Sequence, residues 1–310
     1  MTSRLTIITV TYNSKREIEN FLHSLVEVVP ELGRGGITLE TRIVDNNSSD
    51  GTAQFLSTLE STLLSRLNVI LTFNEQNIGL SRAINRELDS SGSELVLFCN
   101  PDILFTIDII RLIAILERFP RHGIVPELYN MNGTVQRISY RRFPTVTRIA
   151  FDFTVMGNLL SRFFPWIRND YSYKHHRFRS PADYVEQPGG VCLLMHLSDI
   201  RKIRPFFDPA FPVLWNDVDM ALRARELGIK FLIATDVKIF HAHAHSLKRA
   251  DKTLISRLFY SHLGMIGFAT KWKLHPKVLR TILFLDTVFT IVFHRSLNKD
   301  VLTRFRCSLQ

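Results

Sequence analysis

The chain has 310 residues and a mass of 35.8 kDa, which is long enough for one or two domains with a large buried core. Hydrophobic residues make up 45% and charged residues 22%, and this composition excludes an intrinsically disordered protein. The net charge of +10 predicts an anionic partner, which could be a nucleic acid, an acidic lipid or a phosphorylated ligand.

The first 120 residues alternate between the sequence patterns of strands and helices. Short apolar or β-branched runs predict strands at Leu5–Val10, Thr41–Val44, Val69–Phe73 and Leu95–Cys99. Apolar residues at helical spacing predict helices at Lys15–Val29, Thr52–Leu64, Leu80–Leu88 and Thr106–Phe119. Ser48, Ser49 and Asp50 can cap the second helix, because their side-chain oxygens accept its free amide protons. The alternation predicts an α/β fold with a mostly parallel central sheet flanked by helices on both faces.

The alternation stops after Gly123. Residues 137–180 contain nine Arg or Lys and two Asp, interleaved with Phe, Tyr and Trp. This insertion is either an irregular segment with a solvated basic face, or a surface for acidic lipid headgroups or a lipid-phosphate acceptor. Regular structure is predicted again at Val185–Met195, and Val218–Leu227 reads as an amphipathic helix that ends at Gly228.

The C-terminal part begins with two predicted strands, Phe231–Ala234 and Val237–His241. The remainder of the chain is predicted to form basic amphipathic helices with aromatic side chains among Lys and Arg. Its longest apolar stretch, Val278–Phe293, contains Arg280 and Asp286 and is shorter than a bilayer span, so we expect no transmembrane helix there. Some of the 23 phenylalanines could form a surface for lipid or a protein partner.

The three cysteines, Cys99, Cys192 and Cys307, have neither metal-binding spacing nor an even count. Cys99 and Cys192 lie in apolar runs and are interpreted as buried thiols of a reducing compartment. The apolar run Thr6–Val10 is too short for a signal peptide, and polar residues follow it at once. We therefore expect a cytoplasmic protein, with a surface that can face the inner side of the cell membrane.

Acidic residues follow two of the predicted buried strands. In Asn100-Pro101-Asp102, at the end of one strand, Asp102 could bind a hard divalent cation that bridges a diphosphate, although Asn-Pro-Asp is also a common turn sequence. Asp45 ends another strand and could accept a hydrogen bond from a base or a ribose, or could serve only the strand-to-helix turn.

A third acidic cluster, which holds Asp217 and Asp219, stands at the start of a predicted helix. Two residues that are two positions apart do not share a helix face, so one carboxylate is expected to point into a cleft and the other to cap or pair. Such a carboxylate is a candidate general base. Alternatively, it serves only to stabilise the helix N-terminus through a favourable interaction with the helix dipole. His241, His243 and His245 alternate, and three imidazoles could hold zinc. An oxygen-rich site with one imidazole suits manganese or magnesium better, and any single histidine could be a partly buried structural residue.

Several competing motifs are absent from the sequence. It has no Gly-rich phosphate loop, no Gly-x-Ser-x-Gly, no His-Glu-x-x-His and no cysteine with an evident catalytic partner. A nucleotidyltransferase would need the phosphate loop. A non-enzymatic nucleic-acid-binding protein is the alternative from another class, but carboxylates repel a phosphate backbone unless a metal intervenes, and no such binding motif is readable, so we expect no nucleic acid.

Taken in order, these segments resemble the inverting glycosyltransferases of family 2, which have the GT-A fold, and in particular the bacterial rhamnosyltransferase-like branch. The resemblance runs from about Leu5 to Ser246. It rests on Thr9-Val10-Thr11-Tyr12-Asn13, Val44-Asp45-Asn46-Asn47-Ser48-Ser49-Asp50-Gly51-Thr52, Asn77-x-Gly79-x-x-x-Ala83-x-Asn85, Asn100-Pro101-Asp102, Gly189-Gly190, Phe207-Asp208-Pro209, Asn216-Asp217-Val218-Asp219, and His241 with Ser246.

The resemblance implies a role for each matching residue. The residues implied for the nucleotide sugar are Thr11, Tyr12, Asn13, Asp45, Asn77, Gly79, Asn85 and Asn100. Those implied for the acceptor side are Gly189, Gly190, Asp208 and Asp219. Many relatives have Glu-Asp where this chain has Asn216-Asp217. Because the second position is retained, Asp217 is the implied catalytic base. Asp102 and His241 are the implied ligands of Mg²⁺ or Mn²⁺, although Asn100 departs from the strict Asp-x-Asp motif.

The resemblance also implies a function and a domain division. A sugar, first choice L-rhamnose from dTDP-rhamnose, would pass to a hydroxyl of a growing, lipid-linked cell-surface glycan. The alternative in the same class is a UDP-hexose transferase for galactose or galactofuranose. We expect a glycosyltransferase domain at 1–246, divided into a nucleotide-binding half (1–122) and an acceptor-side half (123–246). A basic amphipathic helical extension at 247–310, together with the insertion, is expected to contact an anionic membrane.

Overall fold

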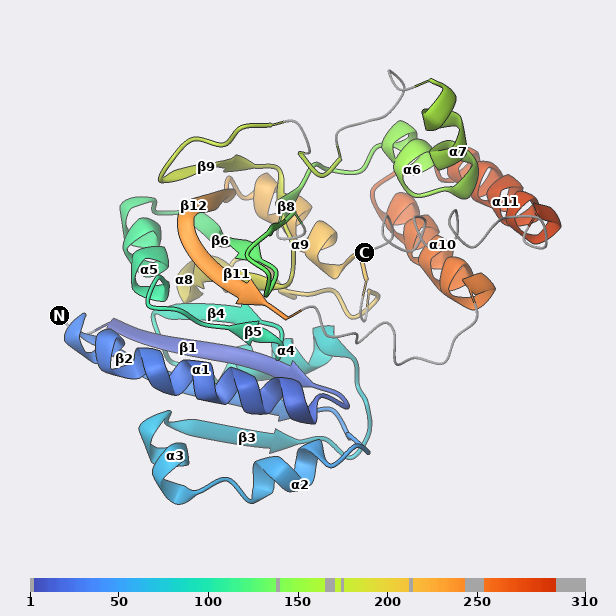
Figure 1. The fold of residues 1–310 in the computed structure, drawn as a ribbon. Helices are drawn as coiled ribbons and strands as arrows, with labels where there is room; N and C mark the ends of the chain where they lie inside the picture. Colours follow the sequence, from blue (N-terminus) through green and yellow to red (C-terminus); the bar gives the residue numbers. More distant parts are fainter. Residues whose placement is uncertain are drawn as a thin grey trace. The chain divides into compact units, whose positions relative to one another are not determined.

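The computed structural model describes residues 3–137, 140–164, 171–173, 176–211, 214–242 and 254–293. The chain forms two compact units, one of residues 1–141 with 176–249, and one of residues 142–175 with 250–310 (Figure 1). The predictions that concern His243, His245, Ser246 and Cys307 lie outside the described residues.

The first unit is a mixed α/β structure around one large sheet. Its strands are β1 (Ser3–Thr11), β2 (Ile37–Asp45), β3 (Val69–Phe73), β4 (Leu95–Cys99), β5 (Ile103–Leu104), β6 (His122–Tyr129), β7 (Val135–Gln136), β8 (Tyr140–Arg141), β9 (Ala182–Val185), β10 (Gln187–Pro188), β11 (Cys192–His196) and β12 (Lys230–His241). Its helices are α1 (Lys15–Arg34), α2 (Thr52–Ser57), α3 (Ser61–Arg66), α4 (Leu80–Ser90), α5 (Ile109–Arg118), α8 (Leu197–Ile200) and α9 (Asn216–Glu226). The predicted α/β class is confirmed.

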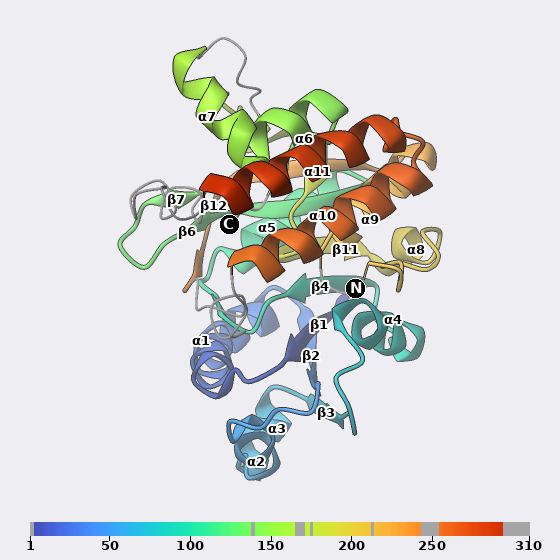
Figure 2. The same cartoon turned by 90° about the vertical axis from the view of Figure 1, so that its right-hand side faces the viewer.

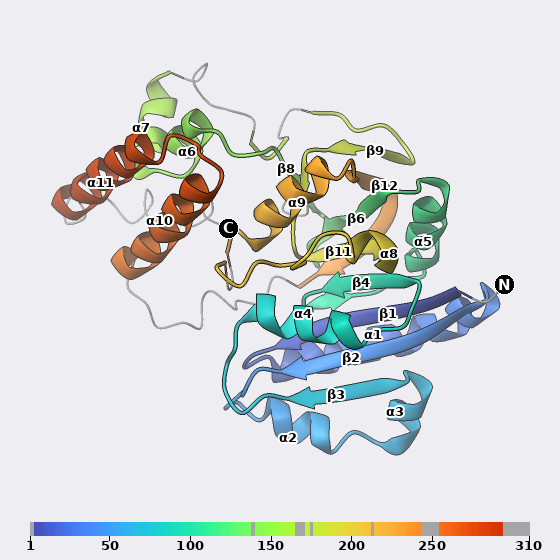
Figure 3. The same cartoon turned by 180° about the vertical axis from the view of Figure 1, so that it is seen from behind.

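The main path of the sheet runs in the order β3-β2-β1-β4-β11-β6-β12-β5. β3, β2, β1 and β4 are parallel, β11 is antiparallel to both its neighbours, and β12 is parallel to β6. Figure 2 shows α1 and α4 on opposite sides of β1 and β2, and Figure 3 shows α4 and α8 on the face away from α1. The mostly parallel sheet is therefore covered on both faces, as predicted.

The face of the sheet beneath α1 carries the hydrophobic core. Ile18, Phe21 and Leu25 recur at helical spacing on α1 and are buried with Leu5 and Ile7 of β1. Alternate residues of a strand point to opposite faces, so Leu5 and Ile7 face this core while Thr6 faces α4. The period-two and period-3.6 patterns of the sequence therefore meet in one apolar layer.

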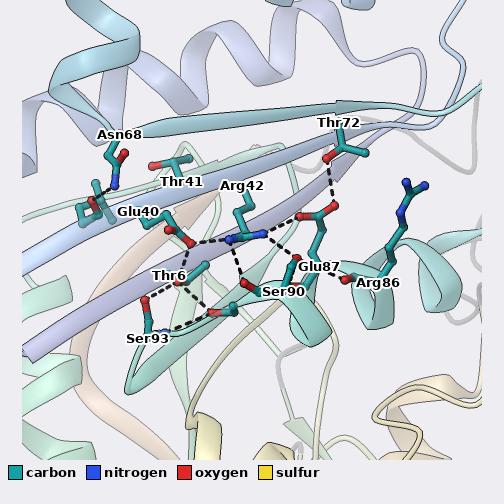
Figure 4. A network of polar contacts seen from close by, with 12 residues as sticks. Thr6, Glu40, Thr41, Arg42, Asn68, Thr72, Arg86, Glu87, Ser90 and Ser93 are labelled. Atoms are coloured by element: carbon teal, nitrogen blue, oxygen red, sulfur yellow. Dashed lines mark hydrogen bonds and ion pairs between the residues drawn. The ribbon is translucent and has the colours of Figure 1, made fainter.

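The opposite face of β1 and β2 carries a buried polar network (Figure 4). Arg42 of β2 donates from Nε to Glu40 Oε1 at 2.7 Å, and from Nη1 to Glu87 Oε2 at 3.1 Å and Ser90 Oγ at 2.8 Å. Thr72 also donates to Glu87 at 3.0 Å. Because Glu87 is buried, its carboxylate depends on the buried Arg42 for charge compensation, while Arg42 pairs with both Glu87 and Glu40.

Several predicted boundaries differ from the structure. The helix expected at Thr52–Leu64 is two short helices, α2 and α3, because the Ser57 and Thr58 hydroxyls donate to carbonyl oxygens at the end of α2 and compete with its continuation. The two strands expected near residue 236 are one strand, β12, with an irregularity between Ala234 and Lys238.

Other local predictions are confirmed. Asp50 accepts the Thr52 N–H at 3.0 Å at the start of α2. Gly228 follows α9 with a φ of +72°, a left-handed conformation that glycine adopts easily. Cys99 and Cys192 are buried free thiols on adjacent strands, and burial raises the pKa of both.

The second unit contains four helices among the described residues. They are α6 (Val146–Asp152), α7 (Val155–Phe163), α10 (Leu254–Lys271) and α11 (Pro276–Phe293). α10 packs beside α11, and α7 also packs against α11 (Figures 1 and 2). None of the helices in the described part of the chain has the length and hydropathy that a bilayer span requires.

We predict that Arg42→Ala lowers the free energy of unfolding by about 3–5 kcal/mol, because it leaves the buried Glu87 carboxylate without its cation. Chemical denaturation of the two proteins measures the difference. Arg34→Ala is the matched control, because Arg34 pairs with Glu31 on the surface and should change the stability by only about 0.5 kcal/mol. A loss for Arg42→Ala no larger than that of the control would contradict a buried, charge-compensated network.

Candidate active site at the carboxyl edge of the sheet

One edge of the sheet collects most of the residues that the sequence singled out. The parallel strands β1, β2, β3 and β4 all end there, β11 begins there, and β12 ends there with His241. Ligands of open α/β sheets bind at this carboxyl edge. Two of the acidic residues singled out in the sequence lie at this edge, since Asp45 ends β2 and Asp102 is three residues beyond the end of β4.

The loops after β1 and β2 are tied together by hydrogen bonds. The buried Asp45 accepts from Thr11 Oγ1 at 3.0 Å, from Ser48 Oγ at 2.6 Å and from Ser48 N at 2.9 Å. Asn13, at a φ of +53°, accepts from Ser49 N at 2.7 Å. Asp45 therefore organises the turn in which it lies, and its predicted contact with a nucleoside stays a prediction.

An open hollow of about 540 Å³ adjoins these loops. It is lined by Asn13, Lys15, Arg16, Glu19, Ser49 and Asp50. Tyr12, next to Asn13, is half exposed at this edge. The lining combines two cations with two carboxylates, and the exposed Tyr12 ring beside it could stack on a planar group.

The segment from β3 to α4 contains a turn at Asn77 and Gly79, and α4 also holds the loop at Phe207. Asn77 accepts from Gly79 N at 2.9 Å, and Gly79 has φ +82° and ψ +158°, a conformation essentially restricted to glycine. Asn85 donates to Phe207 O at 2.6 Å and accepts from Phe207 N at 3.0 Å. The Asn85 amide thus anchors the loop that leads to Asp208 and α9, and a nucleotide contact by it stays a prediction.

Asp102 and His241 are brought together by strand pairing. β5 pairs with the end of β12 so that Ile103 lies opposite His241, and Asp102 O accepts from Ala242 N at 2.9 Å. Asp102 Oδ1 is 3.2 Å from His241 Nε2, and both side chains are buried. Asn100, in the same turn, donates its N–H to Val191 O at 2.9 Å, next to Gly190.

Gln136 orients His241, although no sequence motif singles it out. Gln136 Nε2 donates to the His241 backbone oxygen at 2.9 Å and to Asn130 Oδ1 at 2.5 Å. Because a carbonyl oxygen can only accept, the other amide atom, Oε1, is the one 2.7 Å from His241 Nδ1. Nδ1 therefore carries the proton, and the lone pair of a neutral His241 lies on Nε2, toward Asp102.

This geometry fits a divalent cation. A carboxylate oxygen and an imidazole lone pair that face each other across 3.2 Å need a shared proton or a cation between them. Among the described residues no group of three His, Cys, Asp or Glu could hold a metal, so Asp102 and His241 would be the only such ligands there. Mg²⁺ and Mn²⁺ sites that use one or two protein ligands complete their shell with substrate phosphates and water.

Asp217 and Asp219 have different partners, as their spacing predicts. Asp217, in the first turn of α9, accepts from Gly190 N at 3.3 Å and is half-buried. Asp219 is buried and accepts from Arg223 Nε at 2.9 Å, while Arg223 also donates to Phe206 O. Asp219 therefore stabilises the base of α9 and its neighbouring loop.

The remaining acceptor-side residues belong to two loops that precede α9 in the chain. Gly189 is buried beside Gly190, where an added Cβ would lie 3.6 Å from Asp217 Cβ, an ordinary contact. Asp208 accepts from Ala210 N at 2.8 Å and caps a turn in the loop held by Asn85. Gly190 and Asp217 are thus adjacent at the edge, and Asp208 lies in the supporting loop.

Comparison with known proteins identifies relatives. The model of Glycosyl transferase family 2 matches residues 6–180. The chain is 27% identical over 266 residues to the N-acetylglucosaminyl-diphospho-decaprenol L-rhamnosyltransferase of Mycobacterium tuberculosis, in strains CDC 1551 and H37Rv. This similarity covers 80% of the chain and 79% of the relative.

Solved structures share the fold at low sequence identity. Mannosyltransferase PcManGT from Pyrobaculum calidifontis, in complex with GDP-Man and Mn²⁺, has a TM-score of 0.57 at 14% identity, over 100% of this chain and 80% of that one. S. aureus TarS 1-349 in complex with UDP-GlcNAc has a TM-score of 0.55 at 16% identity, over 99% and 79%. GalNAc-T7 with UDP, GalNAc and Mn²⁺ has 0.56 at 11%, over 77% and 44%. The chain spans 40% of a longer S. aureus TarS chain.

Proposed function

Because the chain belongs to glycosyl transferase family 2 and is an inverting glycosyltransferase with the GT-A fold, we propose that it transfers a sugar from a nucleotide diphosphate to a hydroxyl of a lipid-linked glycan. The proposed donor is dTDP-L-rhamnose, and the proposed acceptor is a sugar on a diphosphopolyprenol carrier. The name of the mycobacterial relative supports L-rhamnose as the sugar and a diphosphopolyprenol carrier for the acceptor. A UDP-hexose is the alternative donor within the same reaction.

Asp217 is the proposed catalytic base. It lies in the first turn of α9, where the helix dipole favours a charged carboxylate, and it is half-buried beside Gly190 at the sheet edge. In this proposal Asp217 takes the proton of the acceptor hydroxyl while the oxygen of that hydroxyl attacks the anomeric carbon of the donor sugar. The new bond forms as the bond to the diphosphate breaks on the opposite side, which inverts the configuration.

Asp102 and His241 are the proposed ligands of Mg²⁺ or Mn²⁺, with Gln136 directing the His241 lone pair toward the ion. A divalent cation there would offset the negative charge that develops on the departing nucleotide diphosphate. The Thr11–Asn13 turn, with Lys15 and Arg16 at the hollow beside it, is proposed to hold the nucleotide. Two structural neighbours contain Mn²⁺ together with a nucleotide or a nucleotide sugar, which supports a divalent ion.

The observation that carries the proposal is the placement of two separate chemistries at one edge of the sheet. Asp102 follows β4, His241 ends β12, and Asp217 contacts Gly190, two positions before β11 begins. β4 and β11 are adjacent strands. A bound diphosphate and an attacking hydroxyl would therefore meet between neighbouring strands.

We predict that Asp217→Asn lowers kcat by about 10²–10⁴-fold while the affinity for dTDP stays unchanged, because the amide keeps the shape of the side chain and loses the base. Initial rates with dTDP-L-rhamnose and a synthetic GlcNAc-diphospholipid, together with calorimetry of dTDP, measure the two quantities. Asp219→Asn is the contrasting variant: it weakens the buried pair with Arg223 and should lower the thermal midpoint. An Asp217→Asn enzyme that keeps most of its turnover would remove Asp217 as the base.

We predict that Asp102→Ala abolishes Mn²⁺ binding in the presence of dTDP, and that Gln136→Leu weakens it by about 10- to 100-fold, since His241 loses the partner that orients it. Electron paramagnetic resonance reads this directly, because bound Mn²⁺ loses the sharp signal of the free ion. Asp89→Ala, which removes an exposed carboxylate, should behave like the wild type. Equal Mn²⁺ affinities for the wild type and Asp102→Ala would reject the assignment.

A further inference from the structure

The C-terminal half of α11 buries two polar residues and exposes large apolar ones. The residues Leu279, Leu283, Asp286 and Thr290 repeat at helical spacing and are buried. The opposite side of the helix exposes Phe284, Leu285 and Val288, with 67% of Phe284 accessible to solvent. An amphipathic surface helix of a water-soluble domain would place Phe284 and Leu285 toward the core and Asp286 toward solvent.

The buried polar residues of α11 have structural partners. Asp286 Oδ1 accepts from Met156 N at 2.9 Å and so holds the first turn of α7. His262 Nε2 of α10 lies 3.8 Å from Asp286 Oδ2, and burial lowers the pKa of His262 to about 4. Burial also raises the pKa of Asp286. Asp286 therefore serves the assembly of the unit, while Phe284, Leu285 and Val288 remain exposed.

The short helix α7 shows the same inversion. Its buried positions include Gly157 and Ser161, whereas Leu160 is exposed and 70% of Phe163 is accessible. Gly157 has no room for a side chain, because an added Cβ would lie 2.0 Å from Ala150 O of α6. The close packing of α6 on α7 thus turns the large side chains outward. We call Leu160, Phe163, Phe284, Leu285 and Val288 the apolar surface of the helical unit.

All of the net charge of the chain lies in this unit. Residues 142–175 and 250–310 contain fifteen Lys or Arg, five Asp and no Glu, a net charge of +10. The other unit contains 24 basic and 24 acidic residues. Several cations adjoin the apolar surface: Arg162 precedes Phe163, and Lys277 and Arg280 are exposed on α11.

These observations select one occupant. A second copy of the chain would bring another +10 charge against the first, and like charges oppose such an association. An anionic bilayer offers phosphate groups to the cations and an acyl boundary to the aromatic and aliphatic side chains. We propose that the apolar surface of α7 and α11 inserts into the headgroup and acyl boundary of an anionic membrane, with Arg162, Lys277 and Arg280 at the lipid phosphates.

This inference deepens the proposed function and rests on it for the lipid-linked acceptor, which the enzyme would meet at the membrane surface. The lipid contact itself needs neither donor nor acceptor. Co-sedimentation of the full chain with phosphatidylglycerol vesicles, and with phosphatidylcholine vesicles, therefore tests the contact alone. We expect binding to the anionic vesicles that weakens at high salt, and little binding to the neutral ones.

The double variant Phe163→Ser with Phe284→Ser should lower the partition coefficient into anionic vesicles by about 100-fold, because each buried phenylalanine contributes about tenfold. Phe73→Ser is the matched control, since Phe73 is an exposed aromatic residue of β3 in the other unit, and its variant should bind like the wild type. Circular dichroism checks that all three proteins fold.

Calorimetry of dTDP with the same proteins separates this inference from the proposed function. Wild-type protein that binds dTDP but not anionic vesicles would overturn the membrane contact and leave the transferase proposal standing. Vesicle binding without dTDP binding would overturn the transferase proposal and leave the membrane contact standing. Equal vesicle binding by the double variant and the wild type would also overturn the inference. So would a dimer, seen by light scattering, that the double substitution dissociates.

Discussion

The pairing of β5 with the last residues of β12 is the constraint on which the site depends. β5 is only two residues long, yet it places the turn after β4 against the end of a strand that lies more than 130 residues further along the chain. Without that pairing Asp102 and His241 would be acidic and imidazole side chains on unrelated loops. With it, they face each other at 3.2 Å inside the protein.

The same edge shows how supporting contacts hold a functional residue in place. Gln136 lies on β7, which pairs with β6. Its amide nitrogen donates to Asn130 Oδ1 and to the His241 backbone oxygen, and its amide oxygen accepts from His241 Nδ1. Asn85 commits both amide atoms to the backbone of Phe207, and Asp219 commits its carboxylate to Arg223. These hydrogen-bonded groups keep the end of β12, the Phe207 loop and α9 in fixed positions around the edge.

Much of the fold follows from local patterns in the sequence. Alternating strand and helix patterns indicated the parallel sheet, and the positions of Asp45 and Asp102 at strand ends indicated the functional edge. Gly228 marked the end of α9 and Asp50 the start of α2, because each acts within one helical turn: Gly228 by its left-handed conformation and Asp50 by accepting the Thr52 N–H. The helix predicted over Thr52–Leu64 was wrong because the Ser57 and Thr58 hydroxyls decide the outcome there, and spacing of apolar residues does not reveal such competition.

The rest required tertiary contacts. The role of Gln136 depends on a residue 105 positions away, and no local signal distinguishes it from any other glutamine. The apolar stretch near the C-terminus predicted a helix. The structure adds that this helix buries Asp286, so that Phe284 and Val288 face outward. Asn85 likewise bonds to Phe207, which is 122 positions away, whereas Asp219 pairs with Arg223 within the same helix.

Calorimetric titration of the wild-type protein with dTDP, UDP and GDP, each with and without Mn²⁺, tests the central claim most directly. The account predicts that one nucleotide, with dTDP as the first choice, binds at least about tenfold more tightly when Mn²⁺ is present, because the Asp102–His241 pair and the diphosphate share the ion. Binding of UDP instead would change the donor and keep the site. Absence of binding by all three nucleotides with either metal condition would contradict the nucleotide-sugar site at this edge of the sheet.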